Sequence, residues 1–444
     1  MTRLLKKLYG TGVIAWHIPF QKGIDRLPVT HLHRIRDRRI RRLVGHAARH
    51  VPYYRDLFRQ QGIDPRDIRT ADDLAQLPLL DKQAVRDNPE AFVSETGQGR
   101  SAIPFKTSGS TGTPLTIYHD RRSLLANMAR TLPEKAVIWE ALGNRSPRQV
   151  KILYSSSTVK KIWEIYRDLS LRLPSLPPLL ELGDPIEHNI GEINRLKPDI
   201  LSSYGSYMEV IFRVADARQI TIHRPGVVVY GADAMSEGGR RLIEEKFGVR
   251  VFSRYAAVES FRIGFTCAHR SGFHIREDLC SLQVVDDEGK RVRNGVPGEV
   301  VITNLVNRGT VLINYRIGDL GALSGEHCAC GRTLPVLAQL EGRTEDIIHL
   351  EDGRMVHPRT VWSVFKERND VLGYQLIQHQ PNRFELKIVP AGNRVDGQVD
   401  GSILEALEKL IGPAKITISI HAELSTDGRK FRPVITRCGS ARGS

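Results

Sequence analysis

The sequence predicts an α/β protein with a large N-terminal domain and a small C-terminal α+β domain. Three short apolar runs are typical of buried strands, at 150–154, 200–204 and 227–230. Two amphipathic stretches between them are typical of helices, at 189–196 and 208–218. Strands that alternate with helices favour a parallel sheet, with ligands bound beyond the carboxyl ends of its strands. After residue 298 short strands follow one another directly, which predicts an antiparallel β subdomain.

Length and composition agree with this division. A chain of 444 residues with 41% hydrophobic residues is globular and long enough for two or three domains. No apolar run approaches the roughly 20 residues that span a bilayer. The mildly apolar stretch 10–20 contains a tryptophan and a histidine and lacks a small-residue cleavage site. We therefore expect neither a transmembrane segment nor a signal peptide, and an amphipathic surface anchor stays open as an alternative.

The net charge of +15 raises the question of a nucleic-acid partner. The basic residues, however, are spread along the chain, and the one dense run, 33–42, alternates with apolar residues at helical spacing. This pattern predicts a solvated helix face packed on a core, so we expect no nucleic-acid partner. A basic surface also attracts small polyanions such as nucleotides.

The first hundred residues predict a helical segment. A helix over 33–60 is broken at Val51-Pro52, Thr70 begins a second helix as a hydroxyl cap, and Asp81 caps a third. Further on, the apolar spacing predicts one long amphipathic helix over 122–139.

The second half of the chain predicts mostly strands. Two strands flank a turn at 307–309 and lie at 299–303 and 311–315, and a linker follows at 342–346. The remaining residues predict the small domain, with strands at 373–379, 383–389 and 415–422 and a helix at 399–411.

One loop has the composition of a phosphate site. Between Lys106 and Thr113 lie four hydroxyl residues and two glycines, namely Thr107, Ser108, Gly109, Ser110, Thr111 and Gly112. Glycine lets backbone N–H groups approach an anion closely, and successive N–H groups form a nest for phosphate oxygens. Thr113 and Pro114 stand where a Walker A loop has its lysine and hydroxyl residue. A plain Ser/Gly surface turn is the alternative.

This loop resembles the phosphate-binding signature of adenylate-forming enzymes, the family of acyl-CoA ligases, luciferases and peptide-synthetase adenylation domains. Several further motifs recur in the order of that family from about residue 32 onward, and they are similar to the phenylacetate–CoA ligase branch with its relatives from capsule-biosynthesis loci. The resemblance implies a helical lead-in over 1–100, an adenylate-forming core over 101–342, a hinge at 343–346 and a small mobile C-terminal domain over 347–444.

The motif Tyr-Ala-Ala-Val-Glu at 255–259 resembles the family's Tyr-Gly-x-Thr-Glu. The resemblance implies that Tyr255 and Ala256 lie beside adenine and that Glu259 is a catalytic residue that helps to hold magnesium. Mg²⁺ prefers carboxylate and phosphate oxygens. Val258 replaces a threonine and removes one hydroxyl contact to phosphate. An exposed glutamate at a strand end is the alternative.

Two more segments resemble nucleotide-binding motifs. One occupies the place of the family's adenine-binding turn and consists of Gly231, Ala232 and Asp233. The other, Tyr-Arg-Ile-Gly-Asp at 315–319, is similar to Tyr-Arg-Thr-Gly-Asp and implies that Asp319 accepts both ribose hydroxyls. An ionised carboxylate has two acceptor oxygens, which suit a vicinal diol. Ordinary turns after strands are the alternatives for both.

The resemblance also implies a hinge and a catalytic cation. Gly-Arg-Thr-Glu-Asp at 342–346 is similar to the family's hinge, where Arg343 reaches the nucleotide and either Glu345 or Asp346 is the pivot. Near the end, Lys430 matches the adenylation lysine, although an inserted Arg429 leaves the choice between these two cations open. A basic tail is the alternative.

The five cysteines do not predict a disulfide framework, since no secretory signal is present, so we expect a cytoplasmic protein. Four side chains have the types and number of a tetrahedral structural zinc site, namely Cys267, His274, Cys328 and Cys330. Their spacing resembles a site found in members of the phenylacetate–CoA ligase branch, and His269 and His327 are spare candidates for ligands. Unliganded thiols are the alternative.

Together these motifs imply an AMP-forming ligase. An organic acid, aryl acids included, would react with Mg-ATP to give an acyl adenylate and pyrophosphate, and the acyl group would then pass to coenzyme A. Two alternatives stay open: acyl or adenylyl transfer to an amine or hydroxyl in polysaccharide or secondary-metabolite biosynthesis, and a non-catalytic nucleotide-binding protein. The sequence leaves a homodimer open as well.

Overall fold

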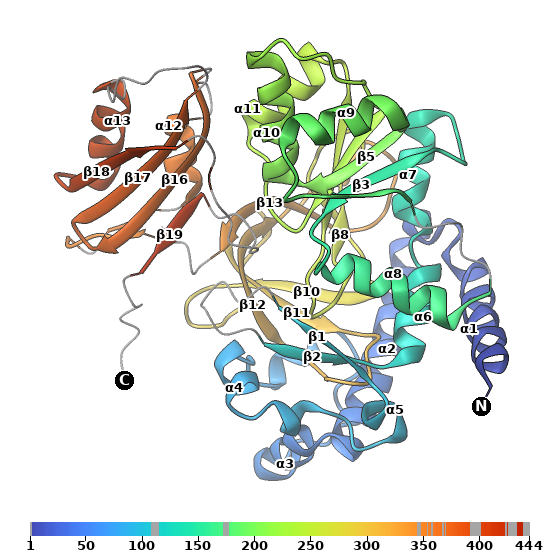
Figure 1. The fold of residues 1–444 in the computed structure, drawn as a ribbon. Helices are drawn as coiled ribbons and strands as arrows, with labels where there is room; N and C mark the ends of the chain where they lie inside the picture. The colour runs from blue at the N-terminus through green and yellow to red at the C-terminus, as the bar shows by residue number, and fades with distance from the viewer. Residues whose placement is uncertain are drawn as a thin grey trace. The chain divides into compact units, whose positions relative to one another are not determined.

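The computed structural model describes residues 2–107, 115–171, 177–343, 348–352, 354–356, 358–365, 368, 370–390, 401–421, 424 and 433–437 (Figure 1). The chain divides into two units, which are treated separately below. The first comprises Met1–Arg145, Ser155–Leu176 and Phe252–Leu340. The second comprises Ser146–Tyr154, Pro177–Val251 and Glu341–Ser444.

The second unit contains the predicted parallel sheet. Its strands lie in the order β6-β5-β3-β4, with β3 at Gln149–Leu153, β4 at Leu179–Glu181, β5 at Ile200–Tyr204 and β6 at Val227–Gly231. All three neighbouring pairs are parallel. The helices α9 (Ile186–Leu196) and α10 (Gly205–Ala217) bury Ile193 and Phe212 against apolar side chains of these strands (Figure 1). The alternation of strand and helix is therefore confirmed.

The first unit contains the predicted antiparallel strands. They lie in the order β10-β11-β12-β13-β9-β8-β7. Their bounds are Arg250–Tyr255 (β7), Gly264–Phe265 (β8), Phe273–Ile275 (β9), Cys280–Val285 (β10), Gly298–Asn304 (β11), Tyr315–Leu323 (β12) and Val336–Arg343 (β13). The pairs β10–β11, β11–β12, β13–β9, β8–β9 and β7–β8 are antiparallel.

Helices make up the N-terminal part of this unit. They are α1 (Arg3–His17), α2 (Val29–His50), α3 (Pro52–Gln61), α4 (Lys82–Asp87), α5 (Gly97–Arg100), α6 (Arg121–Ala129), α7 (Leu132–Leu142) and α8 (Thr158–Leu169). The predicted break between α2 and α3 is confirmed, with Pro52 at the start of α3. The basic run belongs to α2, whose Ile40 and Leu43 are fully buried, as its helical spacing predicted.

Several predicted elements are wrong. The helix expected over 122–139 is two helices, α6 and α7, and Pro133 near the start of α7 has no N–H to continue α6. The strand expected at 311–315 begins only at Tyr315, because Asn314 has a left-handed φ of 52° and the N–H of Val311 bonds to the carbonyl of Phe92. The side chain of Asp81 does not cap α4.

The small domain in the second unit has the predicted α+β composition. Its sheet has the order β18-β17-β16-β19, with β16 at Val371–Gln380, β17 at Arg383–Pro390, β18 at Lys415–Ile420 and β19 at Val434–Thr436. The helices α12 (Pro358–Phe365) and α13 (Gly401–Ile411) share a core with these strands through Val361 and Leu407. The domain limits and the mobility implied by the resemblance stay predictions.

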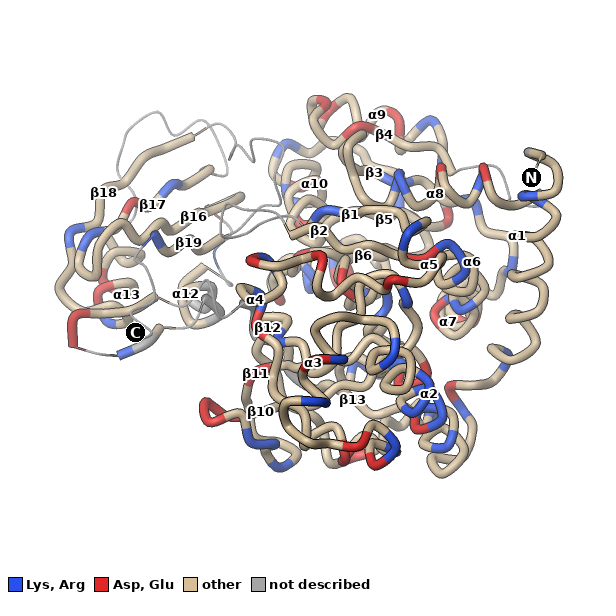
Figure 2. Tube along the Cα trace, turned by 90° about the horizontal axis from the view of Figure 1, so that it is seen from below, with Lys and Arg blue, Asp and Glu red and all other residues tan. Residues whose placement is uncertain are grey.

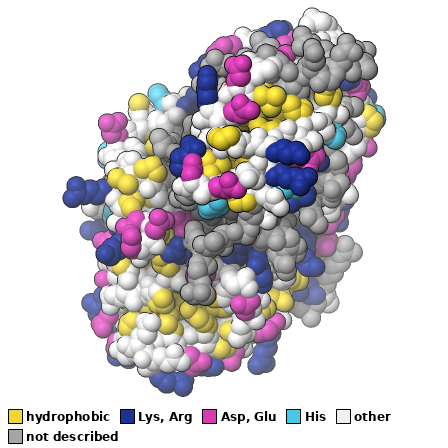
Figure 3. All heavy atoms as spheres, turned by 90° about the vertical axis from the view of Figure 1, so that its left-hand side faces the viewer, with side chains coloured by type: hydrophobic (Ala, Val, Ile, Leu, Met, Phe, Trp, Pro, Cys, Tyr) yellow, Lys and Arg dark blue, Asp and Glu magenta, His cyan; other side chains and the backbone are white. Residues whose placement is uncertain are grey.

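No helix among the described residues is both long and apolar enough to cross a membrane. On the face drawn in Figure 3, Lys and Arg side chains lie among Asp and Glu and do not form one continuous basic surface. The expectation that the chain has no nucleic-acid partner stays a prediction.

A buried charge network ties α2, α6 and the loop after β9 together in the first unit. Arg276 is fully buried and donates to both carboxylate oxygens of Asp278, at 2.8 and 3.1 Å, and to the carbonyl of Arg130 at 2.7 Å. Burial by itself would raise the pKa of Asp278, but Arg276, Arg39 and Arg130 outweigh it and lower this pKa to about 2. The carboxylate is therefore ionised in the folded protein.

We expect Asp278→Ala to lower the free energy of unfolding by about 3–5 kcal/mol, because it leaves the buried Arg276 with only a longer ion pair, to Glu134 at 3.9 Å. The matched control is Asp72→Ala, which breaks an exposed ion pair with Arg291 and should cost at most about 1 kcal/mol. Because the folded pKa lies below the unfolded one, the contribution of Asp278 is present above about pH 4 and is lost between about pH 4 and 2. Urea unfolding at several pH values measures both effects, and equal losses in the two variants would contradict the network.

Candidate nucleotide site and cysteine–histidine cluster

The hydroxyl-rich loop connects two paired strands. β1 (Ile103–Lys106) and β2 (Thr116–His119) are antiparallel, with Lys106 opposite Thr116. The N–H of Thr107 donates to the carbonyl of Leu115 at 2.9 Å, and the N–H of Leu115 donates to Oγ1 of Thr107 at 3.0 Å. The strand predicted after the loop is confirmed. Residues 108–114, with Ser108, Gly109, Ser110, Thr111 and Gly112, lie outside the described residues, so their phosphate role stays a prediction.

Two predicted nucleotide ligands meet in the first unit. Tyr255 ends β7 and Asp319 lies within β12, 64 residues further along the chain. The buried tyrosine donates its hydroxyl to Oδ2 of Asp319 at 2.6 Å. The structure thus joins two motifs that were predicted separately, and it places Asp319 on a strand and not in a turn.

Glu259 is held in place by neighbours from two strands. Its side chain is buried, and Tyr315 donates its hydroxyl to Oε1 at 3.4 Å. The amide of Asn304 donates to the backbone carbonyl of Glu259 at 2.8 Å. The alternative of an exposed glutamate at a strand end is therefore wrong. A carboxylate fixed near Tyr255 has the chemistry to hold Mg²⁺ together with phosphate oxygens.

The third predicted nucleotide segment follows β6 in the second unit. Ala232 has a left-handed φ of 70°, the kind of turn that favours glycine. Asp233 accepts from the N–H groups of Gly205 and Ser206 at 2.5 and 3.3 Å and from the Ser206 hydroxyl at 2.5 Å. Asp233 therefore binds the N-terminus of α10, where a carboxylate also suits the helix dipole. The sequence did not indicate this contact, because the partner lies 28 residues earlier in the chain.

The remaining nucleotide residues are described only in part. Arg343 is the last residue of β13. Glu345, Asp346, Arg429 and Lys430 lie outside the described residues. The hinge and the adenylation cation stay predictions.

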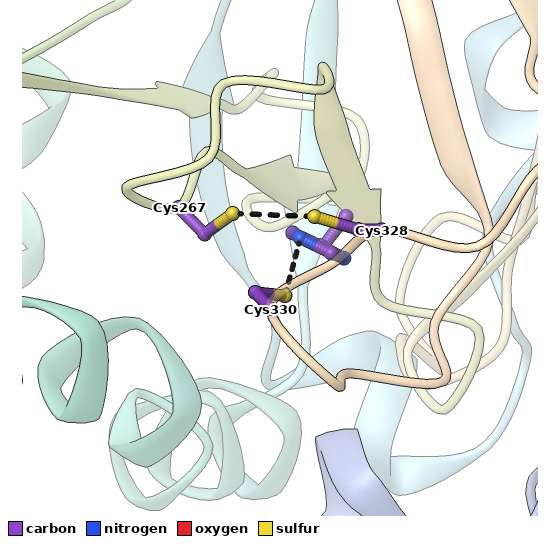
Figure 4. A group of neighbouring side chains, drawn as sticks. Cys267, Cys328 and Cys330 are labelled. Atoms are coloured by element: carbon purple, nitrogen blue, oxygen red, sulfur yellow. Dashed lines mark hydrogen bonds between the residues drawn. The ribbon is translucent and has the colours of Figure 1, made fainter.

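The four predicted zinc ligands converge in the first unit (Figure 4). Cys267 and His274 flank the turn between β8 and β9, and Cys328 and Cys330 lie between β12 and β13. Their ligand atoms all lie within 4.8 Å of one another. The Sγ atoms of Cys267 and Cys328 are 3.6 Å apart, and Sγ of Cys330 is 3.4 Å from Nε2 of His274.

These distances fit a tetrahedral zinc ion. Two thiolates bound at about 2.3 Å would lie about 3.8 Å apart, and a thiolate and an imidazole nitrogen about 3.6 Å apart. Hydrogen bonds also favour thiolate at Cys328: burial opposes its ionisation, but Ser271 and Cys330 outweigh burial and lower its pKa. Among the described residues, a metal could be held by a group of at least three neighbouring His, Cys, Asp or Glu side chains, and this cluster is such a group.

Residues from the N-terminal segment support the cluster. Arg332 donates from Nε to Oδ2 of Asp25 at 2.8 Å, and both side chains are buried. Arg26 donates to the carbonyl of Cys330 at 3.3 Å, and the hydroxyl of Thr333 donates to the carbonyl of Leu27 at 2.5 Å. The sequence analysis missed these contacts, since their partners are about 300 residues apart in the chain. One signal for these contacts was available in the sequence: Asp25 is its first acidic residue, after a long stretch without Asp or Glu.

Known proteins resemble this chain over most of its length. No family model matches the chain. The chain is 27% identical over 368 residues to phenylacetate-coenzyme A ligase of Thermus thermophilus, which covers 81% of this chain and 80% of that protein. It is 21% identical over 360 residues to Protein CapK of Staphylococcus aureus, covering 78% and 76%. The crystal structure of a 2-hydroxyisobutyryl-CoA ligase with R3-HIB-AMP aligns with a TM-score of 0.73 at 17% identity, over 94% of this chain and 92% of that one.

The chain therefore has the fold of the adenylate-forming ligases, as its sequence predicted. Its curated relatives are phenylacetate-coenzyme A ligases and CapK, at 21–27% identity, and this similarity supports the resemblance to the phenylacetate–CoA ligase branch that the motifs predicted.

Proposed function

We propose that this chain is an AMP-forming ligase that activates an organic carboxylic acid and transfers the acyl group to coenzyme A. The observation that carries the proposal is the 2.6 Å hydrogen bond between Tyr255 and Asp319, because it unites the adenine and ribose motifs in one site. Phenylacetate-coenzyme A ligases that match 70–81% of the chain support the same reaction.

The reaction has two steps. A carboxylate oxygen of the acid attacks the α-phosphorus of ATP, the bond between the α- and β-phosphates breaks, and pyrophosphate leaves. The sulfur of coenzyme A then attacks the acyl carbon, and AMP leaves with the oxygen that joined it to the acyl group. Catalysis of the first step requires orientation of the two reactants and neutralisation of charge at the α-phosphate.

Individual residues have distinct roles in this proposal. The loop that includes Thr107, Ser108 and Ser110 donates N–H and hydroxyl groups to phosphates. Glu259 holds magnesium, which neutralises phosphate charge when bound, and its burial and its contact with Tyr315 fix the carboxylate. Lys430 brings a cation to the α-phosphate, and Arg343 contacts the nucleotide.

Asp319→Ala should weaken ATP binding about 10- to 100-fold, because the ribose diol loses a charged acceptor, about 1.5–3 kcal/mol. The matched variant Tyr255→Phe removes the hydroxyl that donates to Asp319 but keeps the ring, so we expect a smaller loss. Calorimetric titration with ATP measures both. Unchanged affinity in Asp319→Ala would rule out the ribose role.

We also propose that Cys267, His274, Cys328 and Cys330 bind one structural zinc ion. The distances between the sulfur and nitrogen atoms and the burial of three of the four residues support this proposal. Zinc there would cross-link the two connections β8–β9 and β12–β13. We also propose that the protein works in the reducing cytoplasm, where its thiols would stay available to bind a metal.

The acyl acceptor and the acid are tested together. The protein is incubated with ATP, magnesium and a mixture of aliphatic and aryl acids, with coenzyme A in one reaction and amine or hydroxyl acceptors in others. Mass spectrometry should show a thioester of coenzyme A. An amide or ester formed in place of a thioester would move the function to the alternative acceptors, and no acid-dependent product in any reaction would favour a non-catalytic nucleotide-binding protein.

A further inference from the structure

The first helix of the chain exposes an unusual amount of apolar surface. Of the twelve large hydrophobic side chains that are exposed among the described residues, seven belong to α1 and the turn after it: Leu4, Leu5, Leu8, Tyr9, Trp16, Ile18 and Phe20. Trp16 and Phe20 are 68% and 62% exposed, and their ring centroids are 6.0 Å apart. We refer to these seven side chains as the α1 apolar face.

The residues of α1 in this set lie on one side of the helix. At about 100° per residue, the five side chains from Leu4 to Trp16 fall within an arc of roughly 140°. Gly12 and Ala15 fall within the same arc and are also exposed. The solvent side of the helix is thus continuously apolar, whereas a surface helix of a globular protein normally presents polar residues there.

The opposite side of α1 is fixed to the first unit. Gly10 is buried, and a side chain there would meet the carbonyl oxygen of Leu169 at 1.8 Å. Oγ1 of Thr11 accepts from the N–H of Leu171 at 2.9 Å, next to the end of α8. The helix packs against α6 and α8 (Figure 1). The apolar face therefore points outward because α1 is anchored through its other side, and a rotation that buried it would expel Gly10 from its contact.

Basic residues border the α1 apolar face. Lys6 and Lys7 lie about 60° beyond its two edges, and Arg3 and His17 lie between them on the remaining arc. Residues 2–24 contain no Asp or Glu, and Figure 2 draws basic but no acidic positions on α1. An apolar side that carries Trp and Leu, with lysines along both of its edges, is the arrangement of helices that lie in the plane of a membrane interface. The tyrosine and tryptophan suit the headgroup region.

We propose that the α1 apolar face docks the protein onto the surface of a lipid bilayer that contains anionic lipids. The helix would lie parallel to the surface, with its leucines and Trp16 among the acyl chains nearest the headgroups and the lysines beside lipid phosphates. The proposal goes beyond the ligase reaction and needs no nucleotide or acid.

The charges favour a membrane over a second copy of the chain. Two copies that met through this face would bring Lys6 and Lys7 of both helices together along its edges, and α1 carries no acidic residue to pair with them. Anionic headgroups supply the missing counter-charge. A bilayer surface can also bury all side chains of the α1 apolar face together.

The test is co-sedimentation of the full chain with vesicles of phosphatidylcholine alone or with about a third of phosphatidylserine. We expect binding to the anionic vesicles that weakens as salt is added. The variant Leu5→Glu with Leu8→Glu should lower the partition coefficient for the vesicles at least about tenfold, because it places two charges on the side of α1 that the membrane would bury. Lys6→Gln with Lys7→Gln should lower it about 25-fold on anionic vesicles, about fivefold for each charge, with little change on neutral ones.

The control is Val296→Glu, which adds one negative charge at an exposed apolar residue elsewhere in the first unit and should bind like the parent chain. Thermal unfolding checks that every variant is folded. A parent chain that stays in the supernatant with anionic vesicles would overturn the proposal. Analytical ultracentrifugation that shows a dimer lost in the Leu5→Glu, Leu8→Glu variant would overturn it as well, since the face would then join two copies.

Discussion

Lys430→Ala should slow the formation of the acyl adenylate about 10²- to 10³-fold, because the α-phosphate loses a preorganised positive charge in the transition state. Transfer of the acyl group from a supplied acyl adenylate to coenzyme A should continue at close to the parent rate. The resemblance implies that the small domain carries this lysine to the nucleotide for the first step only. Single-turnover measurements of each step separate the two effects.

Arg429→Ala is the matched control for this prediction, since it removes the same charge one residue away. We expect this variant to form the adenylate at nearly the parent rate. The reverse result, with Arg429→Ala slow and Lys430→Ala normal, would make Arg429 the adenylation cation. If neither substitution slows adenylation, the segment does not take part in the chemistry.

Cys328→Ser should abolish binding of one zinc ion per chain and lower the Tm by at least about 5 °C. A structural zinc contributes folding free energy directly, and each 1 kcal/mol lost shifts the Tm by roughly 2–4 °C in a unit of this size. Serine cannot replace the thiolate as a soft ligand, and Cys267, Cys330 and His274 would keep an incomplete site. Metal analysis of protein purified without chelators gives the zinc content, and calorimetry gives the Tm.

The control for the zinc prediction is Cys280→Ser. Cys280 is also a fully buried free thiol, but its sulfur donates to the carbonyl of Ser281, at 3.7 Å, and it lies outside the cluster. This variant should keep its zinc. Its free energy of unfolding should fall only by the small amount that results from changing one buried side chain. Parent protein stripped of zinc that unfolds at the same temperature as the zinc-loaded parent would contradict a structural metal.

Local sequence patterns predicted the elements of the parallel sheet well. The run 227–230 (Val-Val-Val-Tyr) is apolar throughout, and the run 200–204 (Ile-Leu-Ser-Ser-Tyr) contains no charged residue, so no distant residue was needed to recognise β5 and β6. Elements that depend on distant partners were predicted less well. The segment 311–314 has a strand composition, but its backbone pairs with N-terminal residues such as Phe92 and Leu80. Composition alone does not reveal such a partner.

The same difference between local patterns and distant contacts applies to the candidate site. The motifs identified Tyr255 and Asp319 separately, while their hydrogen bond depends on the pairing of strands. The residue types of the cluster predicted zinc ligands, and the structure brings them together. The burial of Arg276 and the outward apolar face of α1 ran against composition, since a charge usually lies outside and leucines inside. The burial of Arg276 became visible only with the fold. The stretch 10–20 had left an amphipathic surface anchor open, and the fold shows which side of α1 faces outward.

The central claim is that this chain forms acyl adenylates, and acid-dependent exchange of labelled pyrophosphate into ATP in the absence of coenzyme A tests it most directly. The exchange runs only if the first step occurs by itself and reverses. We predict exchange that requires magnesium and one class of organic acid and that falls about 10²- to 10³-fold in Lys430→Ala. A chain that binds ATP but shows no exchange with any acid of a broad panel would contradict the account.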